Sequence, residues 1–272
     1  MTYHTIMVSM DLSPSADNRV KLAGSIADRF EASLIGVAAR PCDLPIVYGD
    51  VVPPDPTLVE NEKLRLREDF AQVESQFRRA AGNRNSIKWR SGAALPAAFL
   101  AEQARAGDLI VVSRQGRGDP SDLRFGVSPT DALVNIGRPI LVVPPKVDHL
   151  SGRRVLVAWK DTREARRAVW DALPLLSSAV DVFILAVREE APLDAADDVA
   201  EYLARHGIES ATTLRSVANG NVAHEILRTA DREGADLIIS GGYGHSRMRE
   251  WIFGGVTRDL LESAPVCCLM SH

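Results

Sequence analysis

The sequence predicts an α/β protein built from two tandem domains, each a parallel sheet covered by helices. Short apolar runs alternate with helical patterns along the whole chain, which is typical of parallel sheets with right-handed crossovers. The order of these runs occurs twice, and the same number of positions separates three residues around the fourth strand of the first half from their counterparts in the second. The matched pairs are Asp108 and Asp236, Gly116 and Gly244, and Gly126 and Gly254. A constant offset of this kind indicates a duplicated unit.

Composition limits the classes of function. The chain has 272 residues, of which 46% are hydrophobic, so it can bury two ordinary cores. Its net charge of −4 provides no basic field for nucleic acid or for an anionic membrane. No apolar run reaches the length of a membrane span, the N-terminus lacks the shape of a signal peptide, and the three cysteines make no disulfide framework. We therefore expect a cytoplasmic protein.

The first half opens with an apolar run that ends at Asp11. A strand is expected there, followed by a helix to about Phe30 with Ser13 as its N-cap and Pro14 at the first helical position. The segment over 41–56 has five prolines and no helical period, so a surface loop is expected. Further strands are expected over 33–38, 86–89, 109–112 and 140–143, and further helices over 57–81 and 94–105.

The second half opens in the same way, with an apolar run that ends near Asp161 and a helix expected over 162–176. The segment over 144–153 is expected to link the halves, and the two domains are placed at 1–146 and 153–272. Further strands are expected over 182–187, 211–214, 235–240 and 266–270, and further helices over 193–206 and 222–232.

The stretch over 240–257 is the strongest candidate for a ligand site. An apolar strand pattern leads into Gly241 and Gly244, and Gly254 and Gly255 open the next helix. Glycine lets a backbone approach a ligand closely, so two sets of free N–H groups can face one anion. Three arginines near this stretch either pair with phosphate oxygens or belong to a solvated helix face. They are Arg247, Arg249 and Arg258.

Two aspartates, Asp11 and Asp161, follow the first strand of each half. Ligands of a parallel sheet bind outside the carboxyl ends of its strands, so both aspartates lie on the same side as the loops after the fourth strands. Each either caps the helix that follows or contacts a ligand. Since a carboxylate repels phosphate, a ligand contact would be made to ribose hydroxyls or to a base.

These features resemble the tandem form of the universal stress protein family. The resemblance is carried by the strand-end aspartates, by the run Ala-Asp-Leu-Ile-Ile over 235–239, and by the spacing Gly-x-x-Gly, nine residues, Gly-small over 241–255. It covers nearly the whole chain, and it implies two tandem Rossmann-like domains, each a five-stranded parallel sheet sandwiched by helices. It implies that ATP or another adenine nucleotide binds, with or without magnesium: the strand-end aspartate lies near the nucleoside, the backbone after the second strand meets the base, and the glycine loop holds the phosphates. The residues at these positions are Asp161, Val187, Gly241, Gly244, His245, Ser246, Arg247, Gly254, Gly255, Val256 and Thr257.

The resemblance also implies how the halves associate. The fifth strands of such domains commonly pair, which here would join the strands over 140–143 and 266–270 into a dimer within one chain. Association of two chains into a homodimer remains open.

The chain departs from the family pattern in both halves. Gly255 stands where serine or threonine is usual, and Lys160 stands where a small or apolar residue is usual. In the first half Ser113 replaces the first glycine, and Val127 takes the small-residue position, where a β-branched side chain would crowd a phosphate. We therefore expect the first half to be a degenerate copy. The residues left from its site are Asp11, Gly116 and Gly126.

Two other functions remain open beside a regulatory nucleotide. A scaffold or signalling protein would bind no nucleotide, and a slow ATPase would hydrolyse it. The sequence has no Walker-type Gly-Lys-Ser/Thr run and no general base beside the loop, so no catalytic residue is assigned. No pair of histidines has metal-ligand spacing, so no metal site is expected.

Overall fold

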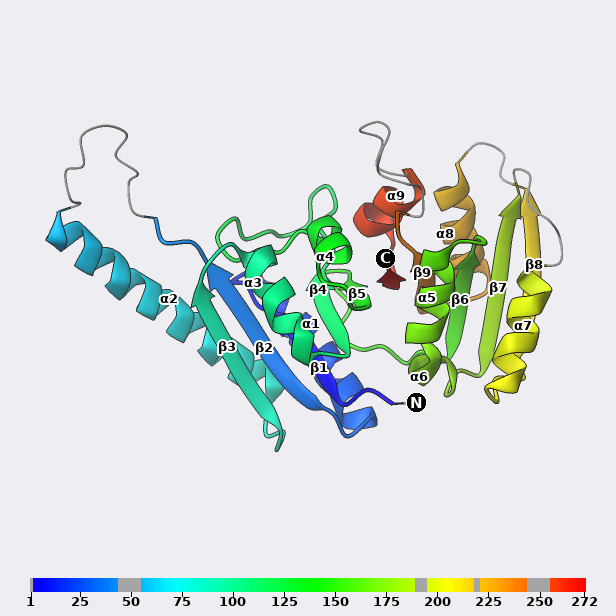
Figure 1. The fold of residues 1–272 in the computed structure, drawn as a ribbon, viewed down its shortest axis with the longest axis horizontal. Coiled ribbons are helices and arrows are strands. Elements are labelled where there is room, and N and C mark those ends of the chain that lie inside the picture. Colours follow the sequence, from blue (N-terminus) through cyan, green and yellow to red (C-terminus); the bar gives the residue numbers. More distant parts are fainter. Residues whose placement is uncertain (1, 44–54, 189–194, 218–220, 244–254) are drawn as a thin grey trace.

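The computed structural model describes residues 2–43, 55–188, 195–217, 221–243 and 255–272. Strands and helices alternate along the chain (Figure 1). The first half contains β1 (Thr5–Ser9), α1 (Ala16–Arg29), β2 (Ser33–Arg40), α2 (Pro56–Ala81), β3 (Ile87–Ala93), α3 (Pro96–Gln103), β4 (Leu109–Ser113), α4 (Pro129–Asn135) and β5 (Ile140–Val143). The second half contains β6 (Arg154–Trp159), α5 (Arg163–Asp171), α6 (Leu173–Leu176), β7 (Asp181–Arg188), α7 (Ala195–Arg205), β8 (Ala211–Val217), α8 (Val222–Arg232), β9 (Leu237–Gly241), α9 (Gly255–Ser263) and β10 (Cys267–Ser271).

Within the described residues, the strands form one ten-stranded sheet with the order β3-β2-β1-β4-β5-β10-β9-β6-β7-β8. Neighbouring strands inside each half run parallel. At the centre β5 and β10 pair antiparallel, with Leu141 opposite Leu269. The predicted fold class is confirmed. The two five-stranded sheets meet edge to edge, so each fifth strand is hydrogen-bonded on both sides.

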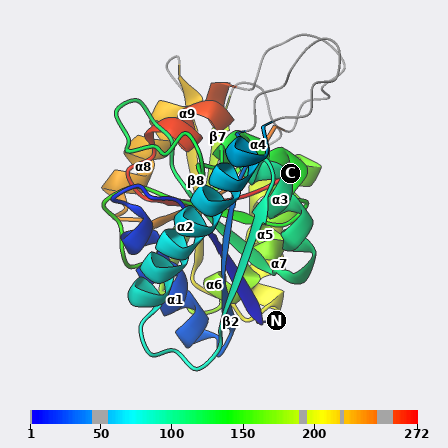
Figure 2. The same cartoon turned by 90° about the vertical axis from the view of Figure 1, so that its left-hand side faces the viewer.

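Helices cover both faces of the sheet. One face packs against α1, α2, α5, α6 and α7, and the other packs against α3, α4, α8 and α9. Viewed from the end formed by the first half, α2 lies outermost (Figure 2). Side chains alternate between the faces along a strand, so Cys267 lies in the first core and Cys268 in the second. Burial raises the pKa of both thiols, which makes them packing groups and not reactive thiolates.

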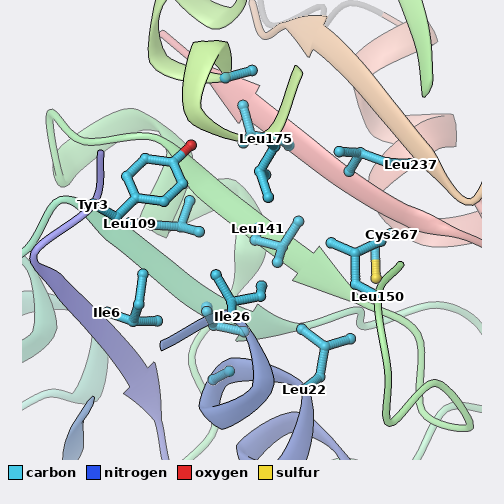
Figure 3. Close-up of a cluster of buried hydrophobic side chains, with 14 of the residues drawn as sticks. Tyr3, Ile6, Leu22, Ile26, Leu109, Leu141, Leu150, Leu175, Leu237 and Cys267 are labelled. Atoms are coloured by element: carbon cyan, nitrogen blue, oxygen red, sulfur yellow. The ribbon is translucent and has the colours of Figure 1, made fainter. Parts of the chain in front are cut away.

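The core of the first face is continuous across the two halves. Figure 3 shows Leu141 of β5 in one cluster with Leu237 and Cys267 of the second half. The hydroxyl of Tyr3, ahead of β1, donates to the carbonyl oxygen of Asp171 in α5 at 2.6 Å. Separating the halves would expose apolar side chains on both, at a cost of about 25 cal/mol for each Å² of apolar surface that becomes accessible to water.

The two halves begin their first strands in the same way. The carboxylate of Asp108, just before β4, accepts the N–H of Thr5 at 2.9 Å. The carboxylate of Asp236, just before β9, accepts the N–H of Gly152 at 2.8 Å. Each aspartate ties the fourth strand of its half to the chain that enters the first strand, which supports the duplication inferred from the sequence.

Two local predictions are wrong. Ser13 does not cap α1, because its N–H and its hydroxyl both donate to the carboxylate of Asp11. Ser15 takes the N-cap position instead, so Pro14 lies before the helix and is not its first residue. The single helix expected over 162–176 is divided into α5 and α6. Pro174 has no N–H to continue the hydrogen-bond ladder of α5, so the chain turns before it.

Candidate functional site

The carboxyl ends of three neighbouring strands bring the described candidate residues of the second half to one edge. β6 lies between β9 and β7, with Ala158 opposite Ser240 and Trp159 opposite Ala186. The residues that follow these pairs are Asp161, Val187 and Gly241, which therefore share the edge where ligands of parallel sheets bind. The predicted positions of Gly244, His245, Ser246, Arg247 and Gly254 lie outside the described residues.

Asp161 does not cap the helix that follows it. The cap of α5 is Thr162, whose hydroxyl oxygen accepts the N–H of Ala165 at 3.3 Å. The carboxylate of Asp161 pairs with the guanidinium of Arg166 at 2.5 Å, and both side chains are more than half exposed. Asp161 is therefore a solvent-accessible carboxylate beside one cation.

Close packing explains why two residues of the glycine stretch are glycines. A Cβ atom on Gly241 would lie 2.5 Å from the backbone nitrogen of Ala165, at the start of α5. A Cβ atom on Gly242 would lie 2.4 Å from a methyl carbon of Leu133, which belongs to α4 of the first half. Gly241 thus permits the first turn of α5 to lie against β9, and Gly242 permits contact between the halves.

Tyr243 holds the start of the loop in a constrained position. Its φ angle is 55°, which is uncommon for a residue other than glycine. Its N–H donates to the hydroxyl oxygen of the buried Thr257 at 3.2 Å. Its own hydroxyl lies 3.2 Å from the hydroxyl of Thr130 in α4. Thr257 therefore contacts the loop backbone directly, and the loop start is tied to the first half.

The N-terminus of α9 supplies backbone donors at the same edge. The first N–H groups of a helix have no partner within it and attract anions; here they belong to Gly255, Val256 and Thr257. Gly255 is exposed, and a Cβ atom there would have no heavy atom within 4 Å. Arg258 pairs with Glu262 one turn further along α9 at 3.5 Å, which agrees with the solvated-face alternative for this arginine.

In the first half, the position equivalent to that of Arg166 is held by a buried arginine, Arg19. Arg19 is 1% exposed. Its guanidinium pairs with the carboxylate of Asp11 at 2.8 Å, donates to the carbonyl oxygen of Ser9 at 2.9 Å, and donates to the hydroxyl of Ser113. Sequence reasoning missed Arg19. Its position four residues after the N-cap, which matches that of Arg166 after Thr162, becomes visible only once the structure shows that Ser15 is the N-cap.

The glycine loop of the first half is closed by its own carboxylate. Asp119 accepts the N–H of Gly116 at 2.7 Å and forms two hydrogen bonds with Arg114, at 2.8 and 2.7 Å. The hydrogen bonds from Arg114 lower the pKa of Asp119, which keeps it ionised. The carboxylate of Asp119 thus occupies the N–H of Gly116, a donor that a bound phosphate would need. The N–H of Gly126 is also occupied, since it donates to the carbonyl oxygen of Asp122 at 2.8 Å.

The closed loop also packs against the second half. The guanidinium of Arg114 donates to the carbonyl oxygen of Ala264, just beyond the C-terminus of α9, at 2.8 Å. A Cβ atom on Gly116 would lie 1.9 Å from the carbonyl oxygen of Glu262. The glycine at this position therefore serves the contact between the halves.

The described residues also bear on metal sites and on membrane spans. No group of three or more His, Cys, Asp and Glu side chains there is arranged to hold a metal ion. None of the helices in the described part of the chain is long and apolar enough to cross a membrane.

Comparisons with known proteins agree with the duplicated fold. A structure of a universal stress protein from Archaeoglobus fulgidus matches with a TM-score of 0.70 at 17% identity, over 98% of this chain and 95% of that one. A functionally unknown protein from Pseudomonas aeruginosa PAO1 matches with a TM-score of 0.55 at 15% identity, over 98% of this chain and 92% of that one. At these identities the likeness shows the fold alone.

Sequence comparison identifies the family. The universal stress protein YxiE of Bacillus subtilis is 34% identical over 89 residues, which span 31% of this chain and 58% of that protein. The family model of the universal stress proteins matches residues 2–144 and again residues 152–272. The chain therefore belongs to the universal stress protein family, with the family unit present twice in tandem.

Proposed function

We propose that the chain is a cytoplasmic stress-response protein whose second half, 153–272, binds ATP or another adenine nucleotide as a regulatory ligand. The first half, 1–146, serves as a structural copy. The observation that carries this proposal is the difference between the two equivalent sites. In the first half Arg19 and Asp119 satisfy the groups that a nucleotide would contact, whereas in the second half Asp161 and Gly255, the first residue of α9, are exposed.

The proposed contacts follow the chemistry of each group. Phosphates, with or without magnesium, would lie against the N–H groups of α9 and of the glycine loop, because these carry partial positive charge. Asp161 would accept hydrogen bonds from ribose hydroxyls, and the backbone at Val187 would meet the base. The antiparallel pair of β5 and β10 serves, in this proposal, as the internal counterpart of a subunit interface.

The test is a calorimetric titration of the full chain with ATP, since the halves share one core. Gly254→Val should weaken ATP binding by roughly 10-fold or more, because a β-branched side chain would keep phosphate away from charge-assisted N–H donors. Leu123→Ser, at a position 98% exposed in the equivalent loop of the first half, is the matched control. Unchanged affinity in a folded Gly254→Val variant would refute the phosphate role of this loop.

A second candidate function is a scaffold that binds no nucleotide. The ion pair between Asp161 and Arg166 favours it, because the carboxylate already has a cationic partner. Mass spectrometry of the denatured, freshly purified protein separates the two functions: a stoichiometric adenine nucleotide supports the first. A nucleotide-free protein that also fails to bind added ATP supports the second.

A further inference from the structure

Helix α4 of the first half lies beside α9 of the second half, near the centre of the molecule (Figure 1). Side chains of α4 reach the residues that follow β9. The hydroxyl of Thr130 lies 3.2 Å from that of Tyr243, and a methyl carbon of Leu133 lies 2.4 Å from the place of a Cβ atom on Gly242. The start of the glycine loop in the second half therefore packs against a helix of the first half.

Tyr243 has a backbone conformation that needs support from its surroundings. Glu31 and Tyr243 are the only residues other than glycine with a positive φ in the described part of the chain. Glu31 follows the end of α1, where a left-handed residue is common. Tyr243 follows a strand, and its φ of 55° costs free energy for a bulky side chain. Such a conformation persists only where the contacts around it determine it.

The backbone of Tyr243 is connected to the first turn of α9. Its N–H donates to the hydroxyl oxygen of Thr257 at 3.2 Å. Thr257 is 7% exposed and carries one of the first N–H groups of α9, which attract anions. A rotation of the Tyr243 backbone would break this hydrogen bond. Two hydrogen bonds thus connect Thr130 of the first half with the N-terminus of α9.

The first half lacks the reciprocal connection. The repeat offset places Gln115 at the position of Tyr243 and Pro129 at the position of Thr257. Proline has no hydroxyl that could accept an N–H, and Gln115 does not have a positive φ. The connection therefore runs from the first half to the second and is not a general consequence of the duplicated fold.

We infer that Thr130 of the first half is a positioning residue for the anion site at the start of α9. Its hydroxyl fixes the side chain of Tyr243, and the N–H of Tyr243 fixes the first turn of α9 through Thr257. The first half thereby sets the orientation in which the N–H groups of α9 meet a phosphate. The inference rests on the proposed function and extends it, because that function gives the first half a structural role only.

Calorimetric titration of the full chain with ATP tests the role of the two hydroxyls. Thr130→Val and Tyr243→Phe each remove one hydroxyl and keep the shape of the side chain. Each should weaken ATP binding by about 3- to 10-fold, as expected for the loss of one hydrogen bond. The double variant should bind no more weakly than the weaker of the two, since both substitutions break the same contact. Thr130→Ser keeps the hydroxyl and should bind ATP as the parent does.

Tyr3→Phe is the matched control. The hydroxyl of Tyr3 also donates across the halves, to the carbonyl oxygen of Asp171, but Tyr3 packs on the opposite face of the sheet from Tyr243. Its loss should lower the urea midpoint and leave ATP affinity unchanged. The inference is overturned if Tyr3→Phe weakens ATP binding as much as Tyr243→Phe does. It is also overturned if Thr130→Val and Tyr243→Phe bind ATP as tightly as the parent.

Hydrogen exchange of the Tyr243 amide, followed by NMR, needs no nucleotide. Thr130→Val should speed this exchange by about 3- to 10-fold, because the side chain that holds the amide against Thr257 loses its hydrogen bond. Tyr3→Phe should leave it unchanged. Unchanged exchange in Thr130→Val overturns the inference. If the parent binds no ATP, faster exchange in Thr130→Val still supports the connection from Thr130 to α9 and the proposed function alone is rejected, so the two can fail separately.

Discussion

The two halves use the same ion pair in different surroundings. In each half an arginine four residues after the helix N-cap pairs with the aspartate at the end of the first strand. The side chain of Arg19 is 1% exposed and that of Arg166 is 62% exposed. Burial makes the first pair part of the core, whereas exposure leaves the second pair able to exchange partners with a ligand.

The glycine loops also show that a residue shared by the two halves can have different roles in them. Gly116 and Gly126 survive in the first half although Asp119 and Asp122 take their N–H groups. A Cβ atom on either residue would clash with a backbone oxygen. A retained glycine is therefore evidence of close packing as much as of a ligand. Experiments must distinguish the packing role of each glycine from a ligand-binding role.

The largest expected effect separates the two ion pairs. Arg19→Met leaves Asp11 buried without its cation and should lower the free energy of unfolding by about 3–5 kcal/mol. Arg166→Met removes an exposed pair and should lower it by less than about 1 kcal/mol. Urea denaturation of the three proteins measures the difference. Equal losses would show that burial does not distinguish the halves.

The next largest effect is the difference in stability between alanine variants of Gly116 and Gly255. Gly116→Ala places a Cβ atom 1.9 Å from the carbonyl oxygen of Glu262 and should cost about 1–3 kcal/mol through displacement of the contact between the halves. Gly255→Ala meets no neighbouring atom and should change stability by less than about 1 kcal/mol in either direction. Thermal unfolding measures both. A stable Gly116→Ala variant would mean that this glycine is not a packing residue.

The third prediction concerns a variant that restores the residue usual in the family at position 255. Gly255→Ser adds a hydroxyl at the start of α9, where the structure leaves room for it. A hydrogen bond to a phosphate should tighten ATP binding by about 10-fold. Gly255→Ala is the control because it adds a Cβ atom without a hydroxyl. Equal ATP affinities of the serine and alanine variants would place the phosphates elsewhere.

The smallest effect concerns pH. Arg114 lowers the pKa of Asp119 in the folded protein. Stabilisation by this carboxylate is therefore complete above its unfolded pKa of about 3.9 and is lost as the pH falls through the lower folded value. Asp119→Asn should lower the urea midpoint at pH 6, and the gap from the parent should narrow as the pH approaches 3. A gap that stays constant over this range would contradict the ion pair as its cause.

The sequence by itself determined the elements and their order. The limits predicted for β5 and α8 match those observed, because each is marked by local apolar periodicity or by a local cap such as Asn221. The repeat offset between Asp108 and Asp236 also held, since each makes the same contact at the start of its half. Periodicity and caps act within a few residues, so they can be read along the chain.

Only the tertiary structure decided what fills each potential site. The burial of Arg19, the contact of Gly116 with Glu262 and the hydrogen bond between Thr130 and Tyr243 all join residues from different elements. Such contacts depend on neighbours distant in sequence, and the local pattern around each residue is nearly the same in both halves.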